Sequence, residues 1–371
     1  MFGNTYHGKR VLVTGHTGFK GAWLITWLLE LGAEVHGLAN GIPTKPSLYE
    51  VLGLASRIQH HEGDIRDFDF VKKTVASARP HFIFHLAAQS IVKKSYDSPL
   101  DTLTTNLLGH AHLLEAVREL GQACVMVMVT SDKCYENQEQ TEGYTEADPL
   151  GGSDPYGASK AAAEIVVRAW QRSFFSEENG PIRIATARAG NVIGGGDWAE
   201  GRIVPDCIRA WSEGQPVHLR KPNATRPWQH VLEPLGGYLR LGQMLAERPD
   251  LSGEAFNFGP MADENRTVLD LLEALSKAWT FAACPLGGGE KKYDFEAANH
   301  FHEANLLALN CEKAVTLLGW RPVLYFEEAA ALTGEWYADF YEGKNSVEAT
   351  LRQLHFYEKT ATERGANWLF R

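Results

Sequence analysis

The sequence predicts an α/β fold in which a parallel sheet is covered by helices on both faces. Short apolar runs alternate with longer segments whose apolar residues recur at helical spacing, which is typical of such a sheet. A glycine-rich turn, Gly15-His-Thr-Gly18-Phe-Lys-Gly21, stands directly after the first apolar run and before the first helical pattern. This order of strand, turn and helix indicates a doubly wound sheet of the Rossmann type that binds a dinucleotide.

The elements expected from these patterns follow one another over the first half of the chain. The strands are expected at Arg10–Thr14, Glu34–Ala39, His81–Leu86, Cys124–Thr130 and Ile182–Arg188, and the helices at Gly18–Leu31, Leu100–Leu120 and Pro155–Phe174. After about residue 190 the pattern is broken by Gly194–Asp197, Gly287–Gly289 and several prolines, although Ala255–Gly259 has the pattern of a late strand that returns to the sheet. We therefore expect a Rossmann domain at 1–190 with a return at about 226–260, and a smaller mixed α/β substrate-binding lobe at 191–225 and 261–371.

The three glycines of the turn each have an expected role. Gly15 allows the tight turn, Gly18 lets the backbone approach a pyrophosphate, and Gly21 permits close packing of helix and strand. The free N–H groups at the start of the helix then face the anion. The spacing is GxxGxxG, which differs from the commoner GxGxxG fingerprint.

Composition excludes several classes of protein. The 371 residues carry a formal charge of −10 and no block of Lys or Arg, which argues against nucleic acid or an anionic membrane as partner. The sequence has no run of eighteen apolar residues and no signal-peptide pattern, so we expect an unprocessed protein of the cytoplasm. Its five cysteines lack CxxC spacing and its histidines lack metal-ligand spacing, so no disulfide framework and no metal site is expected.

Tyr156 and Lys160 form the first candidate catalytic pair. They lie four residues apart in the helix expected at Pro155–Phe174, so both side chains face the same way. The ammonium of Lys160 lowers the pKa of a neighbouring phenol, which would let Tyr156 act as a general base near neutral pH. This pair is typical of hydride-transfer enzymes.

A second set of proton-transfer groups, Ser131-Asp132-Lys133, follows the strand expected at Cys124–Thr130. An acid and an amine at this place could remove a proton from carbon and help a hydroxyl to leave. A plain dehydrogenase needs only one such set, so the residues favour oxidation followed by elimination. An Asp-Lys pair at the end of a strand is, however, more often a solvated turn.

Several stretches resemble the extended short-chain dehydrogenase/reductases and, within them, the nucleotide-sugar 4,6-dehydratases. They are Val13–Gly21, Ala87–Ser90, Thr105–Asn106, Thr130–Asn137, Arg188–Trp198 and Arg226–His230, and the likeness runs from residue 10 to past Trp320. Related dTDP-glucose enzymes carry Thr-Asp-Glu in place of Ser131-Asp132-Lys133, so the lysine resembles the CDP-glucose branch of the family.

The resemblance implies a set of contacts for each ligand. It gives NAD the residues Gly15, Thr17, Gly18, Phe19, Gly21, Asp64, Ile65, Leu86, Ala87, Ala88, Gln89, Thr105, Tyr156 and Lys160. It gives the nucleotide sugar the residues Ser90, Asn191, Arg202 and Arg226. One departure concerns the cofactor ribose, because Leu38-Ala39-Asn40-Gly41 lacks the usual acidic residue at the end of the second strand and offers no arginine for a 2′-phosphate. NAD is favoured over NADP because the implied reaction returns its hydride.

The implied reaction converts CDP-D-glucose to CDP-4-dehydro-6-deoxy-D-glucose and water, an early step of deoxysugar (3,6-dideoxyhexose, O-antigen) biosynthesis. Tyr156 would remove the C4 hydroxyl proton while hydride passes to NAD, and Ser131 would hydrogen-bond the new carbonyl. Lys133, in its neutral form and hence with a lowered pKa, would then take the C5 proton, and Asp132 would protonate the departing C6 hydroxyl.

Two other classes of function stay open. An epimerase or simple dehydrogenase would use Tyr156 and Lys160 but leave Asp132 and Lys133 idle, and a non-catalytic dinucleotide-binding regulator would use none of them. The helices expected at Leu100–Leu120 and Pro155–Phe174 have wide apolar faces, which include Leu107, Leu108, Leu113, Leu114, Val166 and Val167. The resemblance implies that these two helices form a homodimer contact.

Overall fold

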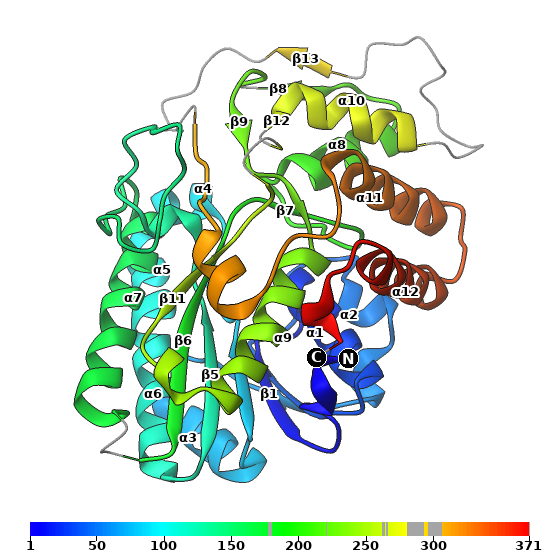
Figure 1. Ribbon diagram of the computed structural model, residues 1–371. Helices are drawn as coiled ribbons and strands as arrows, with labels where there is room; N and C mark the ends of the chain where they lie inside the picture. The colour runs from blue at the N-terminus through cyan, green and yellow to red at the C-terminus, as the bar shows by residue number, and fades with distance from the viewer. Residues whose placement is uncertain are drawn as a thin grey trace.

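A seven-stranded parallel sheet forms the centre of the protein in a computed structural model, with helices packed on both faces (Figure 1). The described residues are 1–176, 180–219, 221–261, 264, 266–279, 293–295 and 306–370. In spatial order the strands are β11 (Ala255–Phe258), β6 (Ile182–Ala189), β5 (Cys124–Val129), β4 (Phe82–His85), β1 (Arg10–Thr14), β2 (Glu34–Ala39) and β3 (Gln59–Glu62). Every pairing in this sheet is parallel, which confirms the predicted α/β fold.

The strands read as continuous apolar runs because both faces of the sheet are covered. In β1, Val11 and Val13 belong to one hydrophobic core and Leu12 belongs to the other, as the period of two requires. The first core includes helices α1 (Phe19–Glu30), α9 (Leu232–Glu247) and α12 (Ser346–Glu363). The second includes α3 (Phe68–Ala78), α6 (Gly109–Leu120) and α7 (Pro155–Phe174).

Strand β3 is the one element of the sheet that the sequence pattern did not predict. Its four residues are Gln-His-His-Glu, and β3 pairs with β2 at the edge of the sheet. An edge strand is only partly covered, so it needs little of the apolar content from which strands are predicted. The late strand predicted at Ala255–Gly259 is confirmed as β11, at the opposite edge.

The helix predicted at Leu100–Leu120 is interrupted by a π-helical turn. It consists of α5 (Pro99–Leu103), the turn Thr104–Leu108, and α6. Asn106 lies in that turn with its side chain fully buried. Apolar periodicity carries no signal for such a turn, and π-helical turns are frequent at functional sites.

The other helices of the described residues, together with small two-stranded sheets, are grouped near the carboxyl ends of the central strands (Figure 1). The helices are α2 (Leu48–Val51), α4 (Val92–Asp97), α8 (Ile203–Ser212), α10 (Val268–Ala278) and α11 (Phe326–Tyr341). The sheets pair β7 (Val192–Ile193) with β10 (Gln229–His230), β9 (Thr225–Arg226) with β12 (Arg266–Thr267), and β8 (Val217–Leu219) with β13 (Tyr293–Phe295). Gly287–Gly289 and Cys284 lie outside the described residues.

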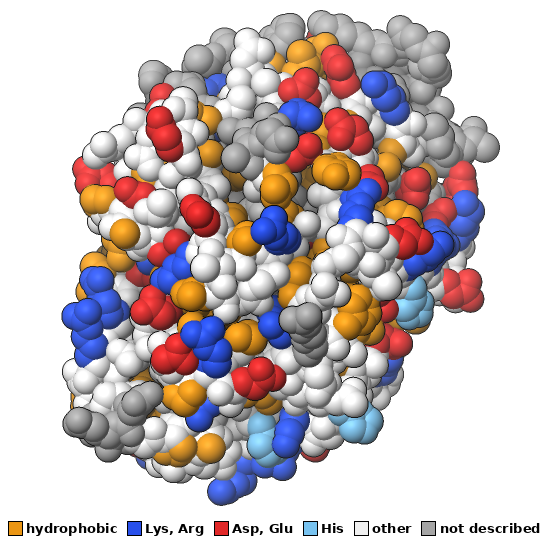
Figure 2. Space-filling model, viewed as in Figure 1, with side chains coloured by type: hydrophobic (Ala, Val, Ile, Leu, Met, Phe, Trp, Pro, Cys, Tyr) orange, Lys and Arg blue, Asp and Glu red, His pale blue; other side chains and the backbone are white. Residues whose placement is uncertain are grey.

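The surface carries both signs of charge. On the face shown in Figure 2, acidic and basic side chains are interspersed instead of being gathered in one patch. In the part of the chain that the structure describes, no helix is both long and apolar enough to cross a membrane.

Candidate active site

The glycine-rich turn packs tightly between β1 and the loop that follows β4. Gly15 has a φ of +72°, and a Cβ at this position would lie 2.8 Å from the backbone nitrogen of Ala87. A Cβ on Gly21 would lie 2.3 Å from the carbonyl oxygen of Gly15. Gly21 was expected to permit helix–strand packing, and it also lets the backbone of the turn pack against the start of the helix. Gly18 caps helix α1 without a side-chain hydrogen bond, which leaves first-turn N–H groups for an anion. This cradle, which no larger residue could form, fits a dinucleotide pyrophosphate.

An acidic group stands beside the end of β2 although the sequence there lacks one. The Nδ2 of Asn40 donates to Oδ2 of Asp64, 2.7 Å away, and Asp64 follows the neighbouring edge strand β3. Arg66 binds the same carboxylate at 2.6 Å, and this contact lowers the pKa of Asp64. Asp64 therefore places beside the end of β2 the carboxylate that the second strand itself lacks. Next to Asn40 in the chain, Gly41 accepts a hydrogen bond at its carbonyl from Thr17 Oγ1, 2.8 Å away.

The loop Leu86–Gln89 is held in place by buried side chains from two elements. Thr14 Oγ1 accepts from the amide of Ala87 at 3.1 Å. Asn106 accepts from the amide of Gln89 at 2.8 Å and donates to the carbonyl of Gln89 and to Ser159 Oγ, both at 2.9 Å. The π-helical turn, which also carries Thr105, thus joins the loop to helix α7. No role was predicted for Asn106, whose only signal in the sequence is its place in a stretch that carries the family resemblance.

Tyr156 and Lys160 lie in the first turns of α7, both buried. The helix begins at Pro155 and is capped by Asp154, whose side chain accepts from the amide of Gly157 at 2.9 Å. Lys160 Nζ donates to the carbonyl of Val129 at 3.4 Å, and the side chain of Tyr156 hydrogen-bonds Ser131.

Burial sets the protonation of this pair. It raises the pKa of Tyr156 to about 12, against the effect of the hydrogen bond to Ser131. It lowers the pKa of Lys160 to about 8, against the effect of the Glu164 carboxylate. We expected Lys160 to lower the pKa of the phenol, but burial outweighs any such effect in the protein alone, and Tyr156 is protonated there.

Ser131, Asp132 and Lys133 follow the end of β5, in a short 3-10 turn (Asp132–Cys134). Ser131 Oγ donates to Asp132 Oδ1 at 2.9 Å and accepts from the amide of Lys133 at 3.2 Å. Among the described residues, Oδ2 of Asp132 has no hydrogen-bond partner although it is buried. Burial raises the pKa of Asp132, which favours the protonated form that a general acid needs. Lys133 is half-buried beside it.

The residues expected to face the nucleotide sugar include two arginines near the catalytic groups, since Arg226 acts on the pKa of Asp132 and Arg202 on that of Tyr156. Arg202 binds Asp197 and Ser90 Oγ, each at 2.8 Å, so it connects the loop after β4 with the start of α8. Arg226 is buried on β9 and donates to the carbonyl of Thr225 at 2.8 Å. Asn191 is half-buried after β6, and its carbonyl accepts from the amide of Gln229.

The structure adds Lys20 to the charged groups of the site. Its Nζ lies 3.5 Å from the hydroxyl of Tyr238. Burial and then the charge of Arg202 lower the pKa of Lys20 to about 7, and Asp132 acts in the opposite direction. The sequence signal was available, since Lys20 stands between two glycines of the turn, but the motif was interpreted through its glycines alone.

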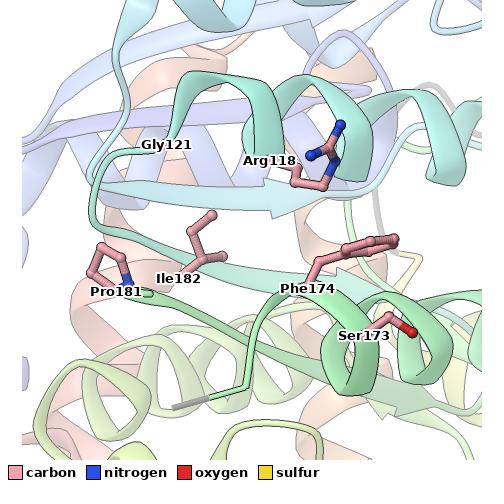
Figure 3. A pocket seen from close by; sticks show the side chains of 6 residues that line it. All are labelled: Arg118, Gly121, Ser173, Phe174, Pro181 and Ile182. Atoms are coloured by element: carbon pink, nitrogen blue, oxygen red, sulfur yellow. The ribbon is translucent and has the colours of Figure 1, made fainter. Parts of the chain in front are cut away.

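All of these residues lie at the carboxyl edge of the sheet, where ligands of open parallel sheets bind. A separate hollow lies between the ends of α6 and α7 and is lined by Arg118, Gly121, Ser173, Phe174, Pro181 and Ile182 (Figure 3). Ile182 begins β6, so this hollow is at the opposite, amino edge, and no predicted site residue lines it. Among the described residues, no group of three or more His, Cys, Asp or Glu could hold a metal ion.

Comparisons with known proteins identify the family of this chain. A family profile described as GDP-mannose 4,6 dehydratase matches residues 12–333. A CDP-glucose 4,6-dehydratase of Salmonella typhimurium is 42% identical over 97% of this chain and 99% of its own length. A dTDP-glucose 4,6-dehydratase of Neisseria gonorrhoeae is 27% identical over 89% of this chain and 96% of its own. Among solved structures, the dTDP-glucose 4,6-dehydratase of Streptomyces venezuelae with NAD and TYD bound has a TM-score of 0.76 at 24% identity, covering 91% of this chain and 99% of that one.

Proposed function

Because this chain belongs to the GDP-mannose 4,6 dehydratase family, we propose that it converts CDP-D-glucose to CDP-4-dehydro-6-deoxy-D-glucose and water. The nearly full-length identity of 42% to a CDP-glucose 4,6-dehydratase supports cytidine as the base of the substrate. The observation that carries the reaction type is the buried contact between two proton-transfer sets. Ser131 touches both Asp132 and Tyr156, so the groups for oxidation and for elimination meet at one place.

The order of the proton transfers follows from the chemistry of elimination. The C5–H of an alcohol is not acidic, so C4 must first become a ketone. Tyr156 is protonated in the protein alone, and the positive charges of Lys160 and of bound NAD would favour the phenolate form that removes the C4 hydroxyl proton. Ser131 hydrogen-bonds the carbonyl oxygen as it forms. Lys133 then removes the C5 proton, and Asp132, whose pKa is raised by burial, gives a proton to the departing C6 hydroxyl. The enone regains a proton at C5.

NAD fits the residues of the cradle, and when bound it supplies the hydride acceptor at C4 and the hydride donor at C6. Gly15, Gly18 and the start of α1 would hold its pyrophosphate, and Asp64 beside Asn40 would face its adenosine. The absence of an arginine at 38–41 supports NAD over NADP. We further propose that the product enters deoxysugar and lipopolysaccharide biosynthesis in the cytoplasm, where the free thiols of the four described cysteines would persist.

One assay separates this function from its alternatives. The purified protein is incubated with CDP-glucose and NAD, and the alkaline absorbance of a 4-keto-6-deoxy sugar is recorded. The dehydratase is expected to produce this absorbance with no net reduction of NAD. An epimerase or dehydrogenase would give a changed sugar or NADH without it, and a regulator would leave CDP-glucose intact.

A homodimer is the proposed assembly. Leu113, Leu114 and Val167, which the sequence analysis placed on apolar faces for pairing, are buried in the core between α6, α7 and the sheet. Other apolar side chains on the same helices are exposed instead, namely Leu100 (76%), Leu108 (47%), Ile165 (50%) and Phe174 (43%). These four residues lie on helical segments that pack against one another, and such a surface supports a two-fold contact.

Ile165→Asp is expected to convert the dimer to a monomer, because the substitution places a charge at an exposed apolar position in the middle of helix α7. Size-exclusion chromatography with light scattering at micromolar concentration measures the mass. Phe356→Asp is the matched control, since Phe356 is 41% exposed on α12, away from these helices, and should leave the dimer intact. A monomeric wild type would contradict the proposal.

A further inference from the structure

A buried ion pair lies one helical turn beyond the predicted catalytic pair. Glu164 follows Lys160 by four residues and Tyr156 by eight on α7, so all three face the same side of the helix. Its carboxylate binds Arg188 of β6 at 2.8 Å, and each side chain is only 4% exposed. The mechanism given above uses neither residue.

The carboxylate of Glu164 has two more partners, and one of them adjoins the catalytic turn. Thr130 Oγ1 donates to Oε1 at 2.5 Å, and Thr186 Oγ1 donates to Oε2 at 2.8 Å. Thr130 directly precedes Ser131. On the other side, Arg188 donates to the hydroxyl of Tyr135 at 2.8 Å, and Tyr135 follows the Asp132–Cys134 turn. The ion pair therefore holds the turn that carries Ser131, Asp132 and Lys133 at both of its ends.

Stability alone is a poor explanation for this arrangement. Taking two charges out of water costs several kcal/mol per ion, and apolar residues of similar volume often stabilise a core equally well. A charge retained beside a catalytic lysine can instead act on that lysine, because electrostatic effects are strong where water is excluded.

Glu164 is the carboxylate among the titratable groups that face Lys160. The others are Cys134 of the 3-10 turn, His85 of β4, His110 of α6 and Lys20 of α1. Burial raises the pKa of Cys134 and lowers those of His85 and His110, so all three are neutral near pH 7. Burial lowers the pKa of Lys160 to about 8, and Glu164 is the largest influence in the opposite direction.

We propose that Glu164 is a positioning residue for both proton-transfer sets, an inference that rests on the proposed dehydratase function. Through Thr130 and Arg188 it fixes the Ser131–Lys133 turn relative to α7. Its negative charge keeps Lys160 cationic at the pH at which Tyr156 must act as a base. Glu164 itself touches neither the sugar nor the cofactor.

The test is the pH dependence of C4 oxidation in Glu164→Gln. The reduced-cofactor absorbance is recorded in single turnovers with CDP-glucose and NAD from about pH 6 to about pH 10. This range extends about two units to either side of the pKa of Lys160. Loss of the Lys160 proton ends activity at high pH. Without the carboxylate the ammonium is less stable, so the alkaline limb is expected to move to lower pH, by about one unit. KM for CDP-glucose is expected to change less than kcat.

Thr186→Val serves as the matched control, because it removes one hydroxyl that hydrogen-bonds the Glu164 carboxylate and leaves the charge of that carboxylate in place. Its alkaline limb is expected to stay at the wild-type pH. Should Glu164→Gln fail to fold, Glu164→Gln combined with Arg188→Met removes both buried charges. It is expected to shift the limb in the same direction by a smaller amount, because the positive charge of Arg188 is lost as well. A folded variant of either kind with the wild-type limb would overturn the inference, whereas a wild type that never oxidises CDP-glucose would overturn the proposed function.

Discussion

Tyr156→Phe is expected to abolish C4 oxidation and overall turnover while leaving the affinity for CDP-glucose nearly unchanged. The substitution removes the hydroxyl that must accept the C4 proton and keeps the ring, which is buried at the start of α7. General acid–base groups contribute roughly 10²–10⁴-fold to rate, so turnover should fall at least by that factor. Product absorbance measures turnover, and calorimetry measures the affinity for CDP-glucose. This affinity should persist because the expected contacts with the diphosphate and the base lie elsewhere.

Tyr49→Phe provides a control for the loss of a buried tyrosine hydroxyl. Among the described residues, the hydroxyl of Tyr49 has no hydrogen-bond partner, and no step of the mechanism uses it. Its removal should therefore leave turnover and the melting temperature close to those of the wild type. If Tyr156→Phe lost binding and activity together, misfolding or a wrong assignment would be the explanation.

The glycine-rich turn, the apolar strands and the catalytic pair were predictable because each has a local signature. Gly15 and Gly18 follow a strand and precede a helix, and Tyr156 and Lys160 are four apart on a helix that Asp154 and Pro155 begin. Such patterns depend on neighbours in the sequence, which the sequence displays directly.

The features that escaped prediction depend on contacts between distant segments. The resemblance implied that Asp64 contacts the cofactor, but not that it bonds Asn40 and so brings a carboxylate to the end of β2 from the segment after an edge strand with no apolar pattern. Asn106 is buried by a π-helical turn that periodicity does not reveal. The pKa of Tyr156 is governed by burial, which a helical spacing of four cannot express. Tertiary packing decided each of these cases.

Lys133→Met is expected to block elimination and leave oxidation intact. Tyr156 and Lys160 lie on α7 and keep their contacts with Ser131 and Val129, whereas Lys133 belongs to the turn after β5. A single turnover with CDP-glucose and NAD should therefore raise the reduced-cofactor absorbance, which then persists because no enone forms to take the hydride back. The rate of product formation should fall by roughly 10²–10⁴-fold, as for the loss of a general base.

Asp132→Asn should show the same separation of the two steps in a milder form. The amide keeps the shape of the side chain but has no proton of suitable acidity for the departing C6 hydroxyl, and water could partly replace the acid. The raised pKa of Asp132 gives the sign of the pH effect, since elimination in the wild type should decline as pH rises through that pKa and the acid loses its proton. In Asp132→Asn this decline should disappear. Near-normal product formation by Lys133→Met, or loss of the reduced-cofactor signal along with the product, would show that the two proton-transfer sets do not divide the reaction between them.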